Sequence, residues 1–392
     1  MFTKTRLFTP GPTMIPEEVR FELAKETIHH RKDDFKKIFG SLSKKLKELF
    51  GTKNDVLVLT SSGTGAMQAA VSNLFSPKEK VLVIVGGKFG ERWKEISYRF
   101  GLDVIELSVE WGKAVEVDKV KEVLDKHKDI KGVLIQASET STGVLHPIKD
   151  IGKVLKDKDV LLIVDGISAI GISPCPMDKW NIDCLVGGGQ KGFMIPPGLS
   201  MISLSDKAWE KAKSIKKRDF YFDLLGEREK QKNLQTLFTP AIALIRALNK
   251  ALDILLKNGL EEVYRKHWAL TCMVREGITR IGLEPMVKEN YTWGLTSVLM
   301  PKGANGQDIL NELKNRYNIV FAGGQGKLKG KIIRIGHMGN VDWIDLMGAI
   351  FALKDVIQDY VKLDVCADFM EKAIFAYKMA LKIDSTTLLS LV

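Results

Sequence analysis

Short hydrophobic runs alternate with amphipathic stretches through the first half of the chain. Each run is six or seven residues long and rich in Val, Leu and Ile, a length that favours strands over helices. Because most positions in the runs are apolar, both faces of each strand are expected to be buried. The predicted strands are DVLVLT (55–60), KVLVIV (80–85), KGVLIQA (131–137), VLLIVDG (160–166) and DCLVGG (183–188).

Helical patterns lie between these runs, for example from Asp118 to His127. Strands that alternate with helices are typical of a mostly parallel α/β sheet. In such sheets the loops at the carboxyl ends of the strands carry the functional site. Two polar segments, SSGTGA (61–66) and SETSTG (138–143), and two single residues, Asp165 and Lys191, occupy such ends.

The pattern changes near Thr239, where long helical stretches begin and continue to Ile281. A smaller α+β unit follows, with LTSVLM (295–300) and KIIRIG (331–336) as strands and a helix over 341–361. We therefore predict three parts, which are an N-terminal arm (1–20), a large domain (21–259) and a small C-terminal domain (260–392).

A terminal helix is predicted between Cys366 and Ile383, because apolar residues recur there on one helical face. A helix that docks on the rest of the protein is favoured over a helix on a membrane surface. The apolar positions are Phe369, Ala373, Ile374, Tyr377 and Leu381.

The composition is that of an ordinary globular protein, with 392 residues, 45% hydrophobic and 27% charged. No run of about 18 apolar residues predicts a membrane span, and the first residues lack the apolar core of a signal peptide. The four cysteines show neither paired nor metal-ligand spacing. We therefore expect a cytoplasmic protein in a reducing setting, without a metal site.

The formal net charge of +11 raises the alternative of nucleic-acid binding. The lysines are scattered through helical stretches such as SLSKKLKELF with acids between them, and no nucleic-acid motif is present. A solvated lysine surface is the favoured interpretation, and it also suits small anionic substrates.

A phosphate cradle is predicted at TSSGTGAMQAA (60–70), where a strand ends and a helix begins. The backbone N–H groups of a helix N-terminus bind anions, and Ser62 and Thr64 add hydroxyl donors. The segment matches neither the Walker loop nor GxGxxG, and by itself it is equally consistent with a simple turn.

Asp165 and Lys191 indicate which kind of ligand this cradle would bind. A strand-end lysine is usually a surface cation, but Lys191 lies within GGGQKGFMIPPG, a stretch of small and rigid residues. Lysine can form a Schiff base with an aldehyde cofactor if its amine is neutral. Asp165 is consistent with a helix cap, or with a carboxylate that keeps a pyridine nitrogen protonated. Cradle, acid and amine in this order point to pyridoxal phosphate.

The chain resembles the class V aminotransferases of pyridoxal phosphate fold-type I, near the alanine–glyoxylate, serine–pyruvate and serine–glyoxylate aminotransferases. The resemblance extends from residue 7 to about Val361. It implies a large domain with a mostly parallel seven-stranded sheet, and a smaller α+β C-terminal domain. The matching motifs are TPGP (9–12), HHR (29–31), SSGTGAMQAA (61–70), GKFGERW (87–93), ETSTGVLHP (139–147), VDGISAIG (164–171), QKGFMIPPG (190–198) and RIGHMG (334–339).

The resemblance also assigns roles in cofactor binding. Asp165 would pair with the ring nitrogen and Lys191 would form the Schiff base, so these two residues would be catalytic. Phe89 would stack on the ring and Thr140 would hydrogen-bond near the ring hydroxyl. The residues implied at the phosphate are Ser62, Gly63, Thr64 and Gln190 of the same subunit, and Thr236 and Thr239 of the neighbouring subunit.

Arg334 would bind the substrate α-carboxylate, since a guanidinium offers two parallel donors and stays charged. Pro10, Gly11 and Pro12 would bring the backbone of the N-terminal arm near the substrate. His30 and His337 are candidates for supporting roles, although a structural role is favoured for both.

The implied function is that of a homodimeric aminotransferase that moves an amino group from alanine or serine to glyoxylate or pyruvate. Another reaction on the same cofactor is an alternative, such as a phosphoserine or aspartate aminotransferase or a desulfurase. A desulfurase needs a cysteine on a loop near the second domain, and VFAGGQGKLKGK (320–331) has none. A further alternative is a non-catalytic subunit with the same fold. Neither a nucleic acid nor a membrane is expected as a partner.

Overall fold

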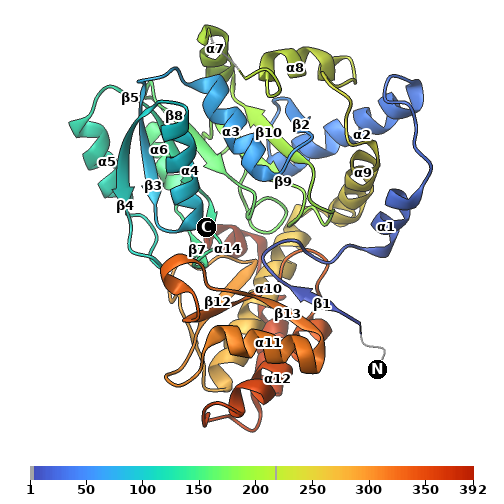
Figure 1. Cartoon of the computed structure of the whole chain (residues 1–392), viewed down its shortest axis with the longest axis vertical. Coiled ribbons are helices and arrows are strands. Elements are labelled where there is room, and N and C mark those ends of the chain that lie inside the picture. Colours follow the sequence, from blue (N-terminus) through green and yellow to red (C-terminus); the bar gives the residue numbers. More distant parts are fainter. Residues whose placement is uncertain (1–3, 217–218) are drawn as a thin grey trace.

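Two β-sheets organise the chain in the computed structural model, which describes residues 4–216 and 219–392. Figure 1 shows the larger α/β part above and a smaller α+β part below it, with the helix α10 (Leu260–Arg280) in the lower part. The boundary predicted at residue 260 stays a prediction, although α10 begins there.

The large sheet has seven strands and is mostly parallel, as the sequence predicts. The pairs β3–β4, β3–β5, β5–β8 and β8–β9 are parallel, whereas β10 runs antiparallel to both of its neighbours. The order of the strands is β2 (Val56–Leu59), β10 (Ser200–Leu204), β9 (Cys184–Gly188), β8 (Leu161–Asp165), β5 (Ile130–Gln136), β3 (Lys80–Val85) and β4 (Asp103–Ser108).

Helices cover both faces of this sheet, which explains the continuous apolar runs. Alternate residues of each strand enter different hydrophobic clusters; Leu162 and Val164 of β8 face one, and Leu161 and Ile163 face the other. One face carries α3 (Gly63–Leu74), α4 (Lys88–Arg99) and α7 (Asp206–Ser214), and the other carries α2 (Asp33–Phe50), α5 (Val117–Lys126), α6 (Ile148–Leu155) and α9 (Ile242–Leu256).

Three further elements border the large sheet. Helix α8 (Leu224–Lys232) contacts the edge strand β2, and α1 (Glu17–Ala24) packs on α9. The hairpin β6 (Ser138–Glu139) and β7 (Val144–Leu145) follows β5 at the carboxyl edge.

The smaller part contains a five-stranded sheet that includes the start of the chain. Strand β1 of the N-terminal arm pairs in parallel with β13, so the arm is fixed to this sheet. The order is β1 (Arg6–Phe8), β13 (Ile319–Gly323), β14 (Ile332–Gly336), β12 (Leu295–Leu299) and β11 (Glu284–Pro285). The remaining elements are α11 (Gly306–Tyr317), η1 (Gly326–Leu328), α12 (Trp343–Gln358), α13 (Phe369–Ala380) and α14 (Ser385–Ser390).

The tail contacts both parts of the molecule. Helix α13 packs on α10 and buries Phe369 and Ala373. Leu388 of α14 is fully buried in a cluster with Ile172 of the large part and Trp293 of the small part. The tail therefore fills the junction between the parts.

The cysteines are all free. Cys175 and Cys184 lie in the two hydrophobic clusters on opposite faces of the large sheet, and Cys272 and Cys366 are half-buried in the smaller part. Among residues 4–216 and 219–392, no helix combines the length and the apolar character needed to span a bilayer.

Candidate active site

A cavity of about 300 Å³ opens at the carboxyl edge of the large sheet. Strands β8 and β9 are parallel neighbours, and Asp165 is the last residue of β8. Lys191 follows the end of β9 by three residues. Ten of the predicted residues line this cavity, which are Gly11, Ser62, Gly63, Thr64, Phe89, Thr140, Asp165, Gln190, Lys191 and Arg334, and Pro10 joins them.

Lys191 is buried and holds its amine in a defined position. The Nζ atom donates a 2.5 Å hydrogen bond to the hydroxyl of Ser168, in the turn after β8. Burial lowers the pKa of Lys191 to about 8; the charge of Asp165 opposes this shift and that of Arg334 adds to it. The amine is therefore neutral at a pH well below the usual lysine range.

Asp165 is also buried, and burial raises the pKa of its carboxyl group. The Lys191 charge and the backbone N–H of Ile167, 2.8 Å from Oδ1, oppose this rise. A carboxylate of this kind is expensive to leave unpaired, so the site favours a cationic or protonated partner at Asp165.

The predicted phosphate cradle is the N-terminus of α3. Ser62 is the N-cap residue, but its side chain makes no capping hydrogen bond, and the first turn contains no acid. A Cβ atom at Gly63 would lie 2.3 Å from Ile167 Cδ1, so a larger residue there would force the Ile167 side chain to shift. The Gly65 N–H donates to the Ser62 carbonyl at 2.8 Å. The N–H groups of Gly63 and Thr64 have no acceptor among the described residues and are available for an anion.

Arg334 reaches the cavity from β14 of the smaller sheet. Its Nε atom donates to the carbonyl of Gly323 at 2.9 Å, and Nη1 donates to the carbonyl of Thr140 at 2.7 Å. Burial lowers the pKa of Arg334 to about 10. Two neutral carbonyls fix the guanidinium while leaving its charge uncompensated by contact, which suits recognition of a carboxylate.

Phe89 is positioned by Glu139, a buried acid that sequence analysis did not assign. A Glu139 oxygen accepts hydrogen bonds from the backbone N–H groups of Phe89 and Gly90, both at 3.1 Å. Burial raises the pKa of Glu139, although these N–H donors and Ser141 oppose the rise. The amine of Lys191 lies 5.1 Å from the centre of the Phe89 ring.

The N-terminal arm closes the cavity beside the lysine. Thr13 donates from its backbone N–H to Gln190 and from its hydroxyl to the Lys191 carbonyl, both at 3.1 Å. Gly11 has φ of +107°, and a Cβ atom there would lie 3.0 Å from Lys191 Cγ. Only glycine fits this approach without strain. Pro12 is exposed and does not line the cavity.

The structure places the other predicted residues elsewhere. Thr236 and Thr239 line a separate small pocket beside β2, and the Thr236 hydroxyl donates to the Phe238 carbonyl at 2.6 Å. His337 is fully buried and contacts Thr296 Oγ1 at 2.9 Å. His30 stacks on His29 and does not line the cavity that contains Lys191.

Several residues of the site, Glu139 among them, were not predicted as site residues. Arg92 and Gln325 line the cavity, and Ser168 holds the Lys191 amine. Arg92 lies within GKFGERW and follows Phe89 by one helical turn. That spacing is the signal that would have placed Arg92 on the same face of α4 as Phe89.

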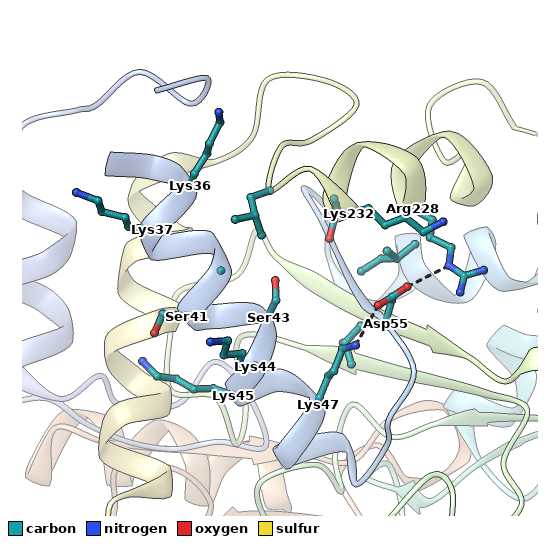
Figure 2. A pocket seen from close by; sticks show the side chains of 15 residues that line it. Lys36, Lys37, Ser41, Ser43, Lys44, Lys45, Lys47, Asp55, Arg228 and Lys232 are labelled. Carbon is teal, nitrogen blue, oxygen red and sulfur yellow. Dashed lines mark hydrogen bonds and ion pairs between the residues drawn. The ribbon is translucent and has the colours of Figure 1, made fainter. Parts of the chain in front are cut away.

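A larger groove of about 950 Å³ lies between α2 and α8 and is lined by basic side chains. Figure 2 shows Asp55 joined to Lys47 and to Arg228, at 3.0 and 3.1 Å. Lys45 pairs with Asp253 at 2.5 Å. Several cations of the groove thus have acidic partners. In residues 4–216 and 219–392, no group of three or more His, Cys, Asp or Glu side chains is arranged to hold a metal ion.

Comparison with known proteins extends over most of the chain. An uncharacterized aminotransferase of Methanocaldococcus jannaschii is 44% identical over 86% of this chain and 88% of its own length. A protein named soluble hydrogenase, small subunit, of Synechococcus sp. is 38% identical over 92% and 94%. The serine–glyoxylate aminotransferase of Methylorubrum extorquens is 35% identical over 88% and 89%.

Solved structures give the same result. The alanine–glyoxylate aminotransferase from Nostoc sp. superposes with a TM-score of 0.87 at 29% identity, over 91% of this chain and 96% of that one. The family model described as aminotransferase class-V matches residues 7–331, a range that holds every residue lining the cavity except Arg334. The prediction of family, fold and transaminase activity is therefore confirmed, and the chain belongs to the class V aminotransferases, a family of pyridoxal phosphate enzymes.

Proposed function

We propose that the cavity binds pyridoxal phosphate and that the protein transfers an amino group from alanine or serine to glyoxylate or pyruvate. The observation that carries this proposal is the placement of Asp165 at the end of β8 and of Lys191 just after the neighbouring β9, where burial lowers the pKa of the amine to about 8. Such a lysine is suited to covalent chemistry with an aldehyde.

The residues of the cavity fit this cofactor. The hydroxyl oxygen of Thr140 is buried and has no hydrogen-bond partner among the described residues, although Thr140 lines the cavity. Buried polar atoms without a partner are rare, so a ligand oxygen near the ring hydroxyl would complete this site. Ser62, Gly63, Thr64 and Gln190 would hold the phosphate, and Phe89 would pack on the ring.

When bound, the cofactor supplies an aldehyde that condenses with amines and a ring that withdraws electrons from the substrate Cα. Asp165 would hold a proton on the ring nitrogen. Lys191 would bind the cofactor covalently, and after release would move a proton between the substrate Cα and the cofactor C4′. Arg334 would hold the substrate α-carboxylate, with Gly11 beside it.

The size of the cavity supports small substrates. A volume of about 300 Å³ lies at the lower end of the range for ligand pockets, and the cofactor itself would take part of it. Little room then remains for a donor side chain, which favours alanine or serine. Two of the similar proteins, named in the preceding section, are glyoxylate aminotransferases.

The alternatives are weaker on specific grounds. The segment 319–331 contains no cysteine for a desulfurase reaction. A non-catalytic subunit would have no need for the buried Lys191 amine, the buried Asp165 carboxyl and the carbonyl-anchored Arg334 together. Aspartate remains the alternative donor to test, because a second arginine, Arg92, lines the cavity.

We also propose a cytoplasmic homodimer in which Thr236 and Thr239 reach the phosphate of the neighbouring subunit. Close to these threonines, Phe220 is 84% exposed and Tyr221 stacks on Phe238 with ring centres 5.3 Å apart. Exposed aromatic groups of this kind are typical of a surface that a second subunit covers. Sedimentation analysis of the purified protein tests this state, and a monomer at micromolar concentration contradicts it.

The proposed reaction is tested by half-reactions of the purified, cofactor-loaded protein with single amino acids. Conversion of the bound cofactor to its amine form is followed by its absorbance. Alanine and serine are expected to convert it, and glyoxylate or pyruvate to reverse the change. Conversion by aspartate alone would replace the proposed donor, and no conversion by any amino acid would contradict the reaction.

A further inference from the structure

Arg92 is a cation of the cavity to which the catalytic scheme above gives no role. It lies on α4, one turn after Phe89, and its guanidinium carbon is 4.9 Å from the centre of the Phe89 ring. Its Nη1 atom donates a 3.2 Å hydrogen bond to Thr64 Oγ1. Arg92 therefore lies against the residues predicted to hold the phosphate.

No acid pairs with Arg92 in the part of the chain that the structure describes. The charge of Arg92 lowers the pKa of Asp165 through space, but among the described residues no ion pair joins the two side chains. The groove in Figure 2 shows the contrast, since Asp55 there contacts both Lys47 and Arg228. Charge-assisted hydrogen bonds to an anion are the strong ones, and among residues 4–216 and 219–392 the side-chain hydrogen bond of Arg92 goes to the neutral Thr64 hydroxyl.

Arg92 lies next to the N-terminus of α3, which carries a partial positive charge of its own. Thr64 is the second residue of α3, whose N-terminus has no capping side-chain bond and no acid in its first turn. The helix dipole places partial positive charge at this point. A guanidinium beside a helix N-terminus is unfavourable unless an anion occupies the space that both of them face.

In the hydrogen bond between Arg92 and Thr64, Arg92 is the donor. Arginine can only donate, so the Thr64 oxygen accepts and the Thr64 proton is free to donate elsewhere. The other predicted residues of the cradle, Ser62, Gly63 and Gln190, carry no charge. Arg92 is thus the cation that contacts the cradle directly.

We propose that Arg92 neutralises the phosphate group of the cofactor, acting together with the hydroxyl of Thr64 and the N-terminus of α3. This inference rests on the proposed function, in that the anion is the phosphate of pyridoxal phosphate. A carboxylate of a dicarboxylic donor is the competing anion. The contact with Thr64 favours the phosphate, because Arg334, on the other sheet, is the residue proposed to hold the substrate carboxylate.

The test compares two ligands that differ only in the phosphate. Protein freed of cofactor is titrated with pyridoxal phosphate and with pyridoxal, and the affinity ratio is measured. Arg92→Gln is expected to weaken pyridoxal phosphate binding about ten- to a hundredfold, the usual worth of a hydrogen-bonded charge. Pyridoxal binding is expected to change less than about twofold, and Arg92→Lys to retain part of the preference.

Arg99→Gln is the matched control, because Arg99 lies on the same helix, is exposed and pairs with Glu95 at 2.9 Å. It should leave both affinities unchanged. Equal weakening of both ligands in Arg92→Gln would assign Arg92 to the ring or to the fold, and would overturn the inference. An unchanged ratio with a raised KM for aspartate alone would assign it to the substrate. Wild-type protein that binds neither ligand would overturn the proposed function itself.

Discussion

The amine of Lys191 donates a 2.5 Å hydrogen bond to the hydroxyl of Ser168. Ser168 lies three residues beyond Asp165, so the turn after β8 orients the lysine that follows β9. The acid and the amine are therefore coupled through a short and buried stretch of backbone. This coupling does not depend on the position of the smaller part.

Loss of this hydrogen bond is expected to affect the proton-transfer step. In Ser168→Ala we expect kcat for transamination to fall about tenfold, the usual worth of a hydrogen bond to a charged group, with little change in cofactor content. Ser173→Ala is the control, since the Ser173 hydroxyl is buried without a hydrogen-bond partner. An equal effect of both substitutions would show that only packing is disturbed.

Borohydride reduction of the cofactor-loaded protein is expected to fix the label on Lys191. Lys266 is an internal control, because burial also lowers the pKa of its amine to about 8, yet it donates to the Gly339 carbonyl outside the cavity. Peptide mapping distinguishes the two sites. Lys191→Ala should lose the label and nearly all turnover, and a label on any other lysine removes the assignment.

Asp165→Asn removes the charge that would hold the ring nitrogen protonated. Cofactor is expected to remain bound, whereas the transamination rate should fall by about a thousandfold, which corresponds to roughly 4 kcal/mol of lost transition-state stabilisation. Single-turnover kinetics with alanine measure this rate. A near-normal rate would mean that another residue pairs with the ring.

Arg334→Lys keeps the charge but loses the two-pronged donor, so binding of amino and oxo acids should weaken by about ten- to a hundredfold. Cofactor content should stay at the wild-type level, because Arg334 donates its hydrogen bonds to the Gly323 and Thr140 carbonyls, which are not part of the phosphate cradle. Titration with alanine, serine and glyoxylate measures the affinity. Unchanged affinity for all three would place the carboxylate elsewhere.

Capture of pyridoxal phosphate by the cofactor-free protein is expected to depend on pH with a midpoint near 8. The neutral amine is the nucleophile, and burial lowers the pKa of Lys191 to about 8, so the capture rate should rise as pH increases and level off above that value. A free lysine derivative measured alongside should still be gaining rate near pH 10. A midpoint shared by both amines would show that the cavity leaves the lysine unperturbed.

The sequence was most informative where two buried faces impose a pattern. The five strands predicted in the first half of the chain are confirmed as β2, β3, β5, β8 and β9, and the two predicted in the second half as β12 and β14. Strand β4 was not predicted because it is a half-exposed edge strand, and β10 was missed because serines at Ser200 and Ser203 interrupt its apolar run.

The residues of the cavity also differ in how well the sequence predicts them. Asp165 and Lys191 stand out because each follows an apolar run and has small neighbours. Neither Arg92 nor Ser168 directly follows an apolar run. In a chain of net charge +11, an arginine in a helix cannot be told from the other surface charges by sequence alone. Thr236 and Thr239 lie outside the cavity of their own subunit, so their assignment as site residues stays a prediction.

Because the four thiols lie in different regions, a thiol-alkylating reagent can distinguish opening of the large part of the molecule from opening of the small part. Thiolate is the reactive form of cysteine. Burial raises the pKa of Cys175 to about 12, and it also raises the pKa of Cys184. Alkylation of these two can proceed only when one face or the other of the large sheet opens, whereas Cys272 and Cys366 report on the smaller part. Mass spectrometry of a labelling time course would therefore give separate opening rates for each region, with no foreign probe introduced.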